Sequence, residues 1–270
     1  MKSIPDFLKW KADGKAITMV TCYDAATAKI VNATSVDSIL IGDSCAMVVH
    51  GFDSTVHATV EMIAAHTAAV RRGAPDKVII ADLPFLSNRK GIDHAMDAVD
   101  QLMKAGANAV KLERRKGNIQ LVEHIVDSGV PVMGHLGLTP QSVNEFGGFK
   151  MQGKSEAAAR ALIEDAQMLE QAGCFSIVLE CIPGDVAAQV TNAISIPTIG
   201  IGCGPDVSGQ VLVINDLLGM DASFQPRFAR KYETLSERIG QAVDRYCADV
   251  RSATFPAAGE YSSRLAKLGS

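Results

Sequence analysis

Four short apolar runs in this chain each lead into an acidic residue. The run at 38–41 is followed within two residues by Asp43, and three later runs end in Asp82, Glu113 and Glu180. Apolar, β-branched runs of this length are typical of strands that are buried on both faces, as in a parallel sheet. Because the carboxyl ends of parallel strands lie at one edge or rim, we expect the four acids to converge there.

The same pattern continues along the whole chain without a linker-like break. Strand-like runs alternate with helix-like segments, and the predicted strands span 17–21, 37–43, 78–82, 109–113, 130–134, 175–180, 197–201 and 211–214. Such alternation indicates parallel strands joined by helical crossovers. The length of 270 residues is close to that of a single (β/α)8 barrel. A TIM barrel is therefore favoured over a doubly wound open sheet, which usually has fewer strands.

We expect one domain over residues 1–270. A short helix at 7–11 should precede the barrel, and a helical tail should follow it from about residue 232 to residue 250. The six cysteines include no CxxC pair, so they are expected to be reduced thiols rather than disulfides.

Charge and hydropathy limit the classes of function. The formal net charge is -4, so the chain lacks the basic footprint of a nucleic-acid-binding protein. No apolar run approaches the roughly 18 residues of a membrane span. The first ten residues are amphipathic, unlike the continuous apolar segment of a signal peptide. We therefore expect a cytoplasmic protein with neither a membrane nor a nucleic-acid partner.

Three of the acids predict a metal site. Asp43, Asp82 and Glu113 follow three successive predicted strands, so they should be neighbours on the rim. Carboxylates that close together repel one another and resist ionisation, and a hard divalent cation would relieve this repulsion. Oxygen ligands point to Mg²⁺, with water or substrate completing the octahedron, and the missing His/Cys cluster argues against zinc.

Two further residues indicate how a substrate is held and activated. Lys111 lies two positions before Glu113 and therefore on the same face of the strand, which suits an anionic substrate such as a 2-oxo acid. Glu180, across the rim, is placed to remove the proton α to the substrate carbonyl. His135, after the fifth predicted strand, is either a substrate contact or a loop hydrogen bond. The alternative for the set is that each acid separately caps a helix, forms a turn or pairs on the surface.

Seven stretches in order resemble the ketopantoate hydroxymethyltransferase family. The most specific is GHLGLTPQS, within the fifth of the stretches at 41–44, 51–55, 81–85, 110–113, 133–142, 178–180 and 196–202. The resemblance implies a TIM barrel of the phosphoenolpyruvate/pyruvate-like superfamily. It also implies transfer of a hydroxymethyl group from 5,10-methylenetetrahydrofolate to 3-methyl-2-oxobutanoate, giving 2-dehydropantoate for pantothenate biosynthesis. A cytoplasmic homodecamer is expected on the same ground.

The resemblance also implies roles for individual residues. Asp43, Asp82 and Glu113 would form the Mg²⁺ site, and Glu180 would be the catalytic proton acceptor. Ser44, Asp82 and Lys111 would hold the 2-oxo acid, and we predict Asp43 and His135 as further substrate contacts from their positions in the sequence. Several positions depart from the family pattern without removing any of these groups: Cys45 with Ala46, His50, Asn88, Arg114 with Arg115, and Cys203.

Two other functions remain open from the sequence. A C–C lyase or mutase acting on a 2-oxo acid could use the same barrel rim. Enzymes of that group typically carry a reactive cysteine in a KKCGH-like loop, and this chain has none. A non-catalytic 2-oxo acid binding protein could have the same set of polar residues.

Overall fold

The structure is a computed structural model, and it describes residues 2–113 and 118–261. The chain divides into two compact units, Met1–Ile214 and Asn215–Ser270. The first unit contains all eight strands, and the second contains the long C-terminal helix. The organisation as a single domain with a helical tail stays a prediction. Arg114 and Arg115, among the departures from the family pattern, lie outside the described residues.

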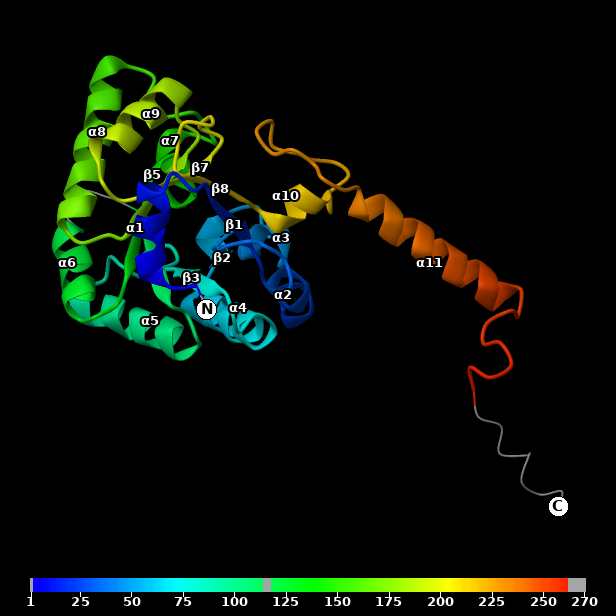
Figure 1. Cartoon of the computed structure of the whole chain (residues 1–270). Coiled ribbons are helices and arrows are strands. Elements are labelled where there is room, and N and C mark those ends of the chain that lie inside the picture. The colour runs from blue at the N-terminus through cyan, green and yellow to red at the C-terminus, as the bar shows by residue number, and fades with distance from the viewer. Residues whose placement is uncertain (1, 114–117, 262–270) are drawn as a thin grey trace. The chain divides into compact units, whose positions relative to one another are not determined.

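Eight parallel strands form a closed barrel in chain order (Figure 1). Strand β1 pairs with both β2 and β8, which closes the ring. The TIM barrel predicted from the sequence is therefore confirmed. The strands are β1 (Ile17–Thr21), β2 (Ser38–Ile41), β3 (Val78–Asp82), β4 (Ala109–Glu113), β5 (Val132–Gly137), β6 (Ser176–Glu180), β7 (Thr198–Ile201) and β8 (Gly209–Leu212).

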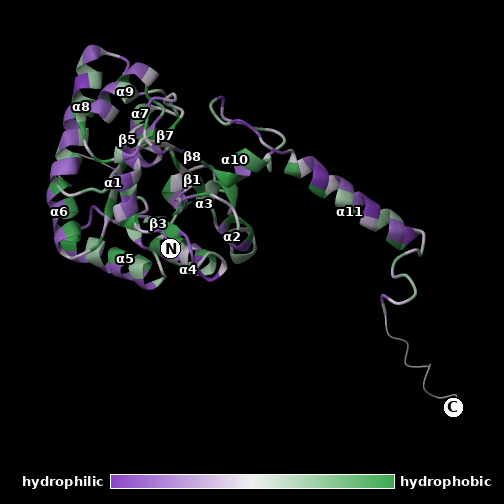
Figure 2. Cartoon of the chain, in the orientation of Figure 1, coloured by the Kyte–Doolittle hydropathy of each residue, from purple (hydrophilic) through white to green (hydrophobic). Residues whose placement is uncertain are grey.

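Helices in the first unit connect successive strands and cover the outside of the barrel (Figure 1). Helix α5 buries Ala95, Ala98, Val99 and Leu102 at helical spacing and leaves its polar residues outside. Figure 2 shows hydrophilic and hydrophobic residues along the same helices.

The described helices of both units are α1 (Ile4–Ala12), α2 (Ala25–Asn32), α3 (Cys45–Val48), α4 (Val60–Gly73), α5 (Ile92–Lys104), α6 (Ile119–Asp127), α7 (Val143–Phe146), α8 (Glu156–Gln171), α9 (Gly184–Ala193), α10 (Ile214–Leu218) and α11 (Leu235–Arg251), with short 3₁₀ turns η1 (Thr55–His57) and η2 (Pro140–Ser142).

The barrel interior is mostly apolar up to the level of the acids, with the buried hydroxyl groups of Ser38 and Ser176 as exceptions. Alternate residues of the strands fill it, among them Leu40, Ile80 and Met133. Helix α1 covers the amino end of the barrel, where the ring of Phe7 lies 5.2 Å from that of Phe175, edge to face. The buried charged groups Asp82, Lys111 and Glu113 lie towards the opposite, carboxyl end.

Two predicted strand positions are wrong by a few residues. The fifth strand was expected at 130–134, but the Val130 amide donates to Ile125 in the turn after α6, and the ladder continues to Gly137. His135 therefore lies inside β5 and not after it.

The eighth strand was expected at 211–214 but begins at Gly209. A Cβ atom at Gly209 would lie 2.3 Å from the carbonyl oxygen of Ile17, so the close pairing of β8 with β1 requires a glycine. The apolar run that predicted the strand starts only two residues later.

The remaining expectations concern termini, cysteines and membranes. The first helix is longer than predicted because Pro5 lies in its first turn and Asp6 completes a capping box with Ser3. All six cysteines are free thiols. In the described part of the chain, no helix is both long and apolar enough to cross a membrane.

Candidate active site

The four acids lie together at the carboxyl ends of the strands. Strands β3, β4 and β6 end in Asp82, Glu113 and Glu180, and Asp43 follows β2 by two residues. Strands β2, β3 and β4 are neighbours in the barrel order, as predicted. Asp43, Asp82 and Glu113 are less than 10% exposed, and the Glu180 side chain is 16% exposed.

Asp82 connects Asp43 to Lys111. Its Oδ2 atom accepts a hydrogen bond of 3.0 Å from the Asp43 backbone amide. Its Oδ1 atom lies 2.9 Å from Nζ of Lys111, whose side chain is 7% exposed. The register pairs Asp82 directly with Lys111, so the barrel itself brings this ion pair together.

His135 joins Lys111 to Glu180. Its Nδ1 atom accepts from Lys111 Nζ at 3.4 Å, because an ammonium group has only donors. Nδ1 is also 3.7 Å from Oε1 of Glu113. The proton of the neutral ring must then be on Nε2, which lies 3.2 Å from Oε2 of Glu180 but outside hydrogen-bond alignment. Glu180 is therefore not isolated across the rim, because the imidazole of His135 lies between it and Glu113.

Burial controls the protonation of this cluster. It raises the pKa of Asp43 to about 7, with the Asp82 charge adding to the effect, and raises the pKa of Glu180 to about 7. Burial also raises the pKa of Glu113 well above its ordinary value. It lowers the pKa of His135, as does the Lys111 charge, so the imidazole is neutral.

Lys111 behaves in the opposite way to an ordinary buried lysine. Burial alone would lower its pKa, but the charges of Asp82, Asp43 and Glu113 raise it overall. Lys111 is therefore a permanent cation. In the part of the rim that the structure describes, one lysine faces four carboxyl groups, so full ionisation of these acids would require a further cation beside them.

The chemistry of the cluster fits a hard cation. The atoms of the four acids that could bind a metal ion are all carboxylate oxygens. One of them, the buried Oε2 atom of Glu113, has no hydrogen-bond partner within residues 2–113 and 118–261. In the same ranges, no three His, Cys, Asp or Glu side chains converge on a common point. Mg²⁺ is usually held by one or two carboxylates with water and substrate, so this arrangement suits it better than a site made entirely of protein ligands.

Gln141, which the sequence reasoning did not single out, holds two of the acids in place. Its side-chain amide donates to Oδ2 of Asp43 at 2.9 Å and to the carbonyl of Leu83 at 3.0 Å. Its backbone amide donates to Oε1 of Glu113 at 3.3 Å. Gln141 belongs to the GHLGLTPQS stretch, so the motif included this residue, but the sequence did not reveal its contact with Asp43.

Ser44 is placed beside the acids by two neighbours. Its hydroxyl is 2.9 Å from the hydroxyl of Tyr23, a residue that directly follows β1 and Cys22. A Cβ atom at Gly42 would lie 2.6 Å from Ser44 Oγ, so the glycine makes room for the hydroxyl. Ser44 therefore lies beside Asp43 with a defined side-chain direction.

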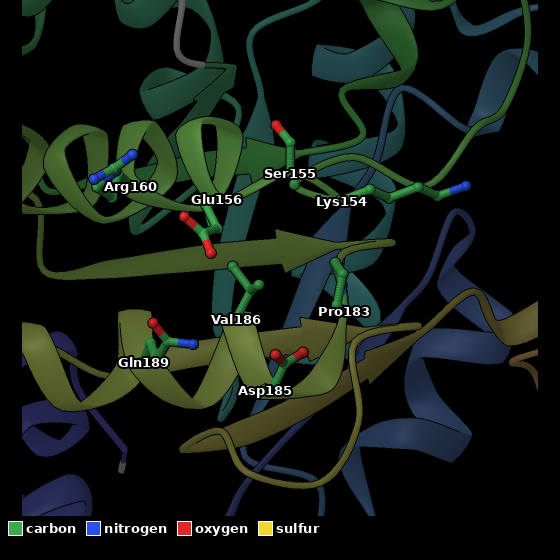
Figure 3. Close-up of a pocket in the computed structure, with 10 residues that line it drawn as sticks. Lys154, Ser155, Glu156, Arg160, Pro183, Asp185, Val186 and Gln189 are labelled. Atoms are coloured by element: carbon green, nitrogen blue, oxygen red, sulfur yellow. The ribbon is translucent and has the colours of Figure 1, made fainter.

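A separate hollow of about 440 Å³ lies between the starts of α8 and α9 (Figure 3). In Figure 3 the Glu156 side chain points toward α9, and the Lys154 side chain extends away from that helix. This hollow shares no residue with the acid cluster, and none of the predicted site residues lines it.

Comparisons with known proteins agree with these observations. The family described as ketopantoate hydroxymethyltransferase matches residues 1–258. The chain is 51% identical over 256 residues to 3-methyl-2-oxobutanoate hydroxymethyltransferase from Francisella tularensis subsp. novicida, covering 95% of this chain and 97% of that protein.

Two solved structures share the fold at low sequence identity. One is 2,3-dimethylmalate lyase, of the PEP mutase/isocitrate lyase superfamily (TM-score 0.59, 12% identity, 98% of this chain and 93% of that chain covered). The other is phosphonopyruvate hydrolase in complex with oxalate and Mg²⁺ (TM-score 0.61, 12% identity, 96% and 93% covered). At this identity the likeness supports the barrel fold alone.

Proposed function

The chain belongs to the ketopantoate hydroxymethyltransferase family, and we propose on that premise how its residues carry out the transfer. The substrate is 3-methyl-2-oxobutanoate, and the one-carbon donor is 5,10-methylenetetrahydrofolate. With one water molecule they give 2-dehydropantoate and tetrahydrofolate. The observation that carries the proposal is the buried Glu180 carboxyl group, 3.2 Å from a neutral His135 beside Lys111.

The substrate-binding residues provide one cation and several oriented polar groups. Lys111 is a permanent cation at the base of the cluster and attracts the substrate carboxylate. Ser44, whose hydroxyl is fixed by Tyr23, donates to the same end of the substrate. Asp43 and Asp82, with Glu113 beside them, would hold Mg²⁺. Bound Mg²⁺ would supply a Lewis acid that favours loss of the proton α to the keto group.

Glu180 is the proposed base. A pKa of about 7 leaves a large fraction of Glu180 ionised at neutral pH and still basic enough to take a proton from carbon. It removes the C3 proton, and the resulting enolate forms a bond to the methylene carbon as one of the two C–N bonds of that carbon to the folate breaks. Water then replaces the second folate nitrogen on the methylene carbon, which gives the hydroxymethyl group, and the released nitrogens take up protons to give tetrahydrofolate. His135, with its proton on Nε2, lies 3.2 Å from Oε2 of Glu180, so the neutral imidazole lies beside the proposed base.

The cellular setting is proposed from the family and from the C-terminal unit. We propose a cytoplasmic homodecamer that serves pantothenate biosynthesis. Helix α11 supports association because it buries none of its residues, and Ile239, Val243 and Tyr246 form an apolar stripe about half exposed. Exposed apolar stripes of this kind mark contacts between proteins.

Proton NMR of 3-methyl-2-oxobutanoate in D₂O tests the assignment of Glu180. With enzyme and Mg²⁺ but no folate, we expect the C3 proton signal to disappear. Glu180→Gln should slow this exchange by about 10²–10⁴-fold, the range for loss of a general base. Glu156→Gln, in the separate hollow, should exchange at the normal rate.

The outcomes separate the proposed function from its alternatives. Exchange at full rate in Glu180→Gln would reject Glu180 as the base. If exchange is absent without folate, the experiment is repeated with tetrahydrofolate present. Turnover with methylenetetrahydrofolate excludes a mere binding protein, whereas cleavage of a C–C bond in the oxo acid would indicate the lyase chemistry.

A further inference from the structure

A pair of histidines lies outside the acid cluster and has no part in the proposed reaction. His50 follows α3 and is exposed, and His66 lies on α4 and is half-buried. Their Nε2 atoms are 2.9 Å apart. The ring centroids are 5.2 Å apart and the planes are inclined at 63°, so the rings are not stacked. Both imidazoles therefore turn the same nitrogen toward one point.

The main chain sets the proton position on His66. Its Nδ1 atom lies 2.6 Å from the carbonyl oxygen of Tyr23. A carbonyl oxygen can only accept, so Nδ1 carries the proton and the neutral ring presents a lone pair at Nε2. A histidine whose second nitrogen donates to a carbonyl is the usual arrangement of a metal ligand, because that bond orients the ring and makes it more basic.

The separation of the two nitrogens suits a shared ion. Two nitrogens bound at about 2.1 Å to one metal in neighbouring positions are about 3.0–3.4 Å apart. The histidines at 2.9 Å need to open by only a few tenths of an ångström. The Asp24 carboxylate interacts electrostatically with His66, and a negative charge there favours a bound cation.

We propose that His50 and His66 form a two-nitrogen site for a borderline divalent transition metal ion, Zn²⁺ or Ni²⁺. Imidazole ligands favour these ions, whereas Mg²⁺ prefers the oxygen ligands of the acid cluster. The ion takes the place of the proton between the two Nε2 atoms, and that proton moves through solvent to Nδ1 of His50. Water completes the coordination, since no third His, Cys, Asp or Glu in the described ranges joins the pair.

The site would fasten the segment after α3 to α4. His66 is bonded to the carbonyl of Tyr23, whose hydroxyl lies against Ser44 at the start of α3. The His50 backbone amide donates to the carbonyl of Cys45 in the same helix. A bound ion therefore adds a cross-link between two segments already connected through hydrogen bonds, and it should stabilise the folded protein.

Titration calorimetry with Zn²⁺ tests the site on the full chain. Saturating Mg²⁺ is present throughout, so that the acid cluster does not compete. We expect one Zn²⁺ per chain and a rise in Tm on its addition, because an ion that binds only the folded state stabilises it. His50→Gln and His66→Gln should each lower the affinity by about tenfold or more, as loss of a ligand or its support does.

The control is His94→Gln, which replaces an exposed histidine on α5. It should bind Zn²⁺ like the original chain. His50 is exposed, so His50→Gln should fold even where His66→Gln does not. Unchanged Zn²⁺ affinity in His50→Gln would overturn the proposal. So would a wild-type chain that gives neither binding heat nor a Tm shift, because the two rings would then share only a hydrogen bond.

Discussion

Asp37, at the amino end of the barrel, should be a major source of stability that is independent of catalysis. It directly precedes β2, and its side chain is 4% exposed. Oδ1 accepts from Lys2 Nζ at 2.7 Å and from Lys15 Nζ at 3.1 Å. Oδ2 accepts from the amide and the hydroxyl of Thr18 at 2.9 and 2.8 Å. The charge of Asp37 therefore fastens the segment before α1 to β1 and β2.

The shift in the pKa of Asp37 gives the free energy by which these contacts stabilise the folded protein. Burial alone would raise it, but the hydrogen bonds from Lys2, Thr18 and Lys15 lower it from 3.8 to about 2. At 1.36 kcal/mol per pKa unit, this shift corresponds to about 2.4 kcal/mol. Lys2 and Lys15 are partly exposed to solvent, which screens the interaction, so we expect Asp37→Asn to cost about 1–2 kcal/mol at pH 7.

The stabilisation by Asp37 should be lost as the pH becomes acidic. The pKa is lowered in the folded state, so the stabilisation is fully present above the unfolded value near 3.8. It is lost as the pH falls through about 2. The difference in unfolding free energy between wild type and Asp37→Asn should therefore shrink between pH 4 and pH 2, while the titration of other groups cancels.

Urea unfolding followed by circular dichroism measures this difference. Asp53→Asn is the matched control, because the Asp53 side chain is 94% exposed and its loss should change stability by less than about 0.5 kcal/mol. Equal stability of Asp37→Asn and wild type at pH 7 would refute the reasoning. A deficit of the same size at pH 7 and pH 2.5 would also refute it, because the cost would then come from shape and not from charge.

Four further outcomes are expected. The pH profile of kcat/KM should fall below pH 7, because protonation of Glu180 removes the proposed base, whose pKa is raised to about 7. Gly209→Ala should lower Tm by several degrees in thermal unfolding, since its Cβ would press on the main chain of β1. Gly240→Ala on α11, where nothing lies within 4 Å, should instead raise helix stability by up to about 1 kcal/mol. Gln141→Ala should raise the Mg²⁺ concentration needed for half-maximal activity severalfold in a metal titration, since Asp43 loses its orienting donor.

A specific result would contradict each of these expectations. A flat profile of kcat/KM between pH 5 and pH 8 would show that the protonation of Glu180 does not control the rate. A Gly209→Ala protein as stable as wild type would mean that β1 and β8 can move apart at no cost. An unchanged Mg²⁺ requirement in Gln141→Ala would show that the amide bond to Asp43 has no effect on the metal site.

The acids at the strand ends were predictable because strand cores reject charge. An acidic residue directly after a buried run has few structural reasons to be there, and the parallel topology brings such residues to one rim. The structure places Asp43, Asp82 and Glu113 at the carboxyl ends of adjacent strands for this reason. Their roles toward metal and substrate stay predictions.

The contacts that join these residues could not be predicted in the same way. The amide of Gln141 reaches Asp43 across 98 positions of sequence, and no periodicity reports such a contact. The position of His135 inside β5 follows from its pairing with Glu113 and Val178, which depends on the register of two neighbouring strands. Local apolar patterns place a strand to within a few residues, whereas register decides which side chains meet.

The closure of the amino end of the barrel has a kinetic consequence. Phe7 of α1 is fully buried against Phe175, so this end offers no passage through the described part of the barrel. In the proposed reaction both substrates must then use the carboxyl-end mouth, and the small oxo acid binds at its bottom, beside Lys111. We expect ordered kinetics, with the oxo acid entering first and its product leaving last, and substrate inhibition wherever the larger folate occupies the mouth before the oxo acid has bound.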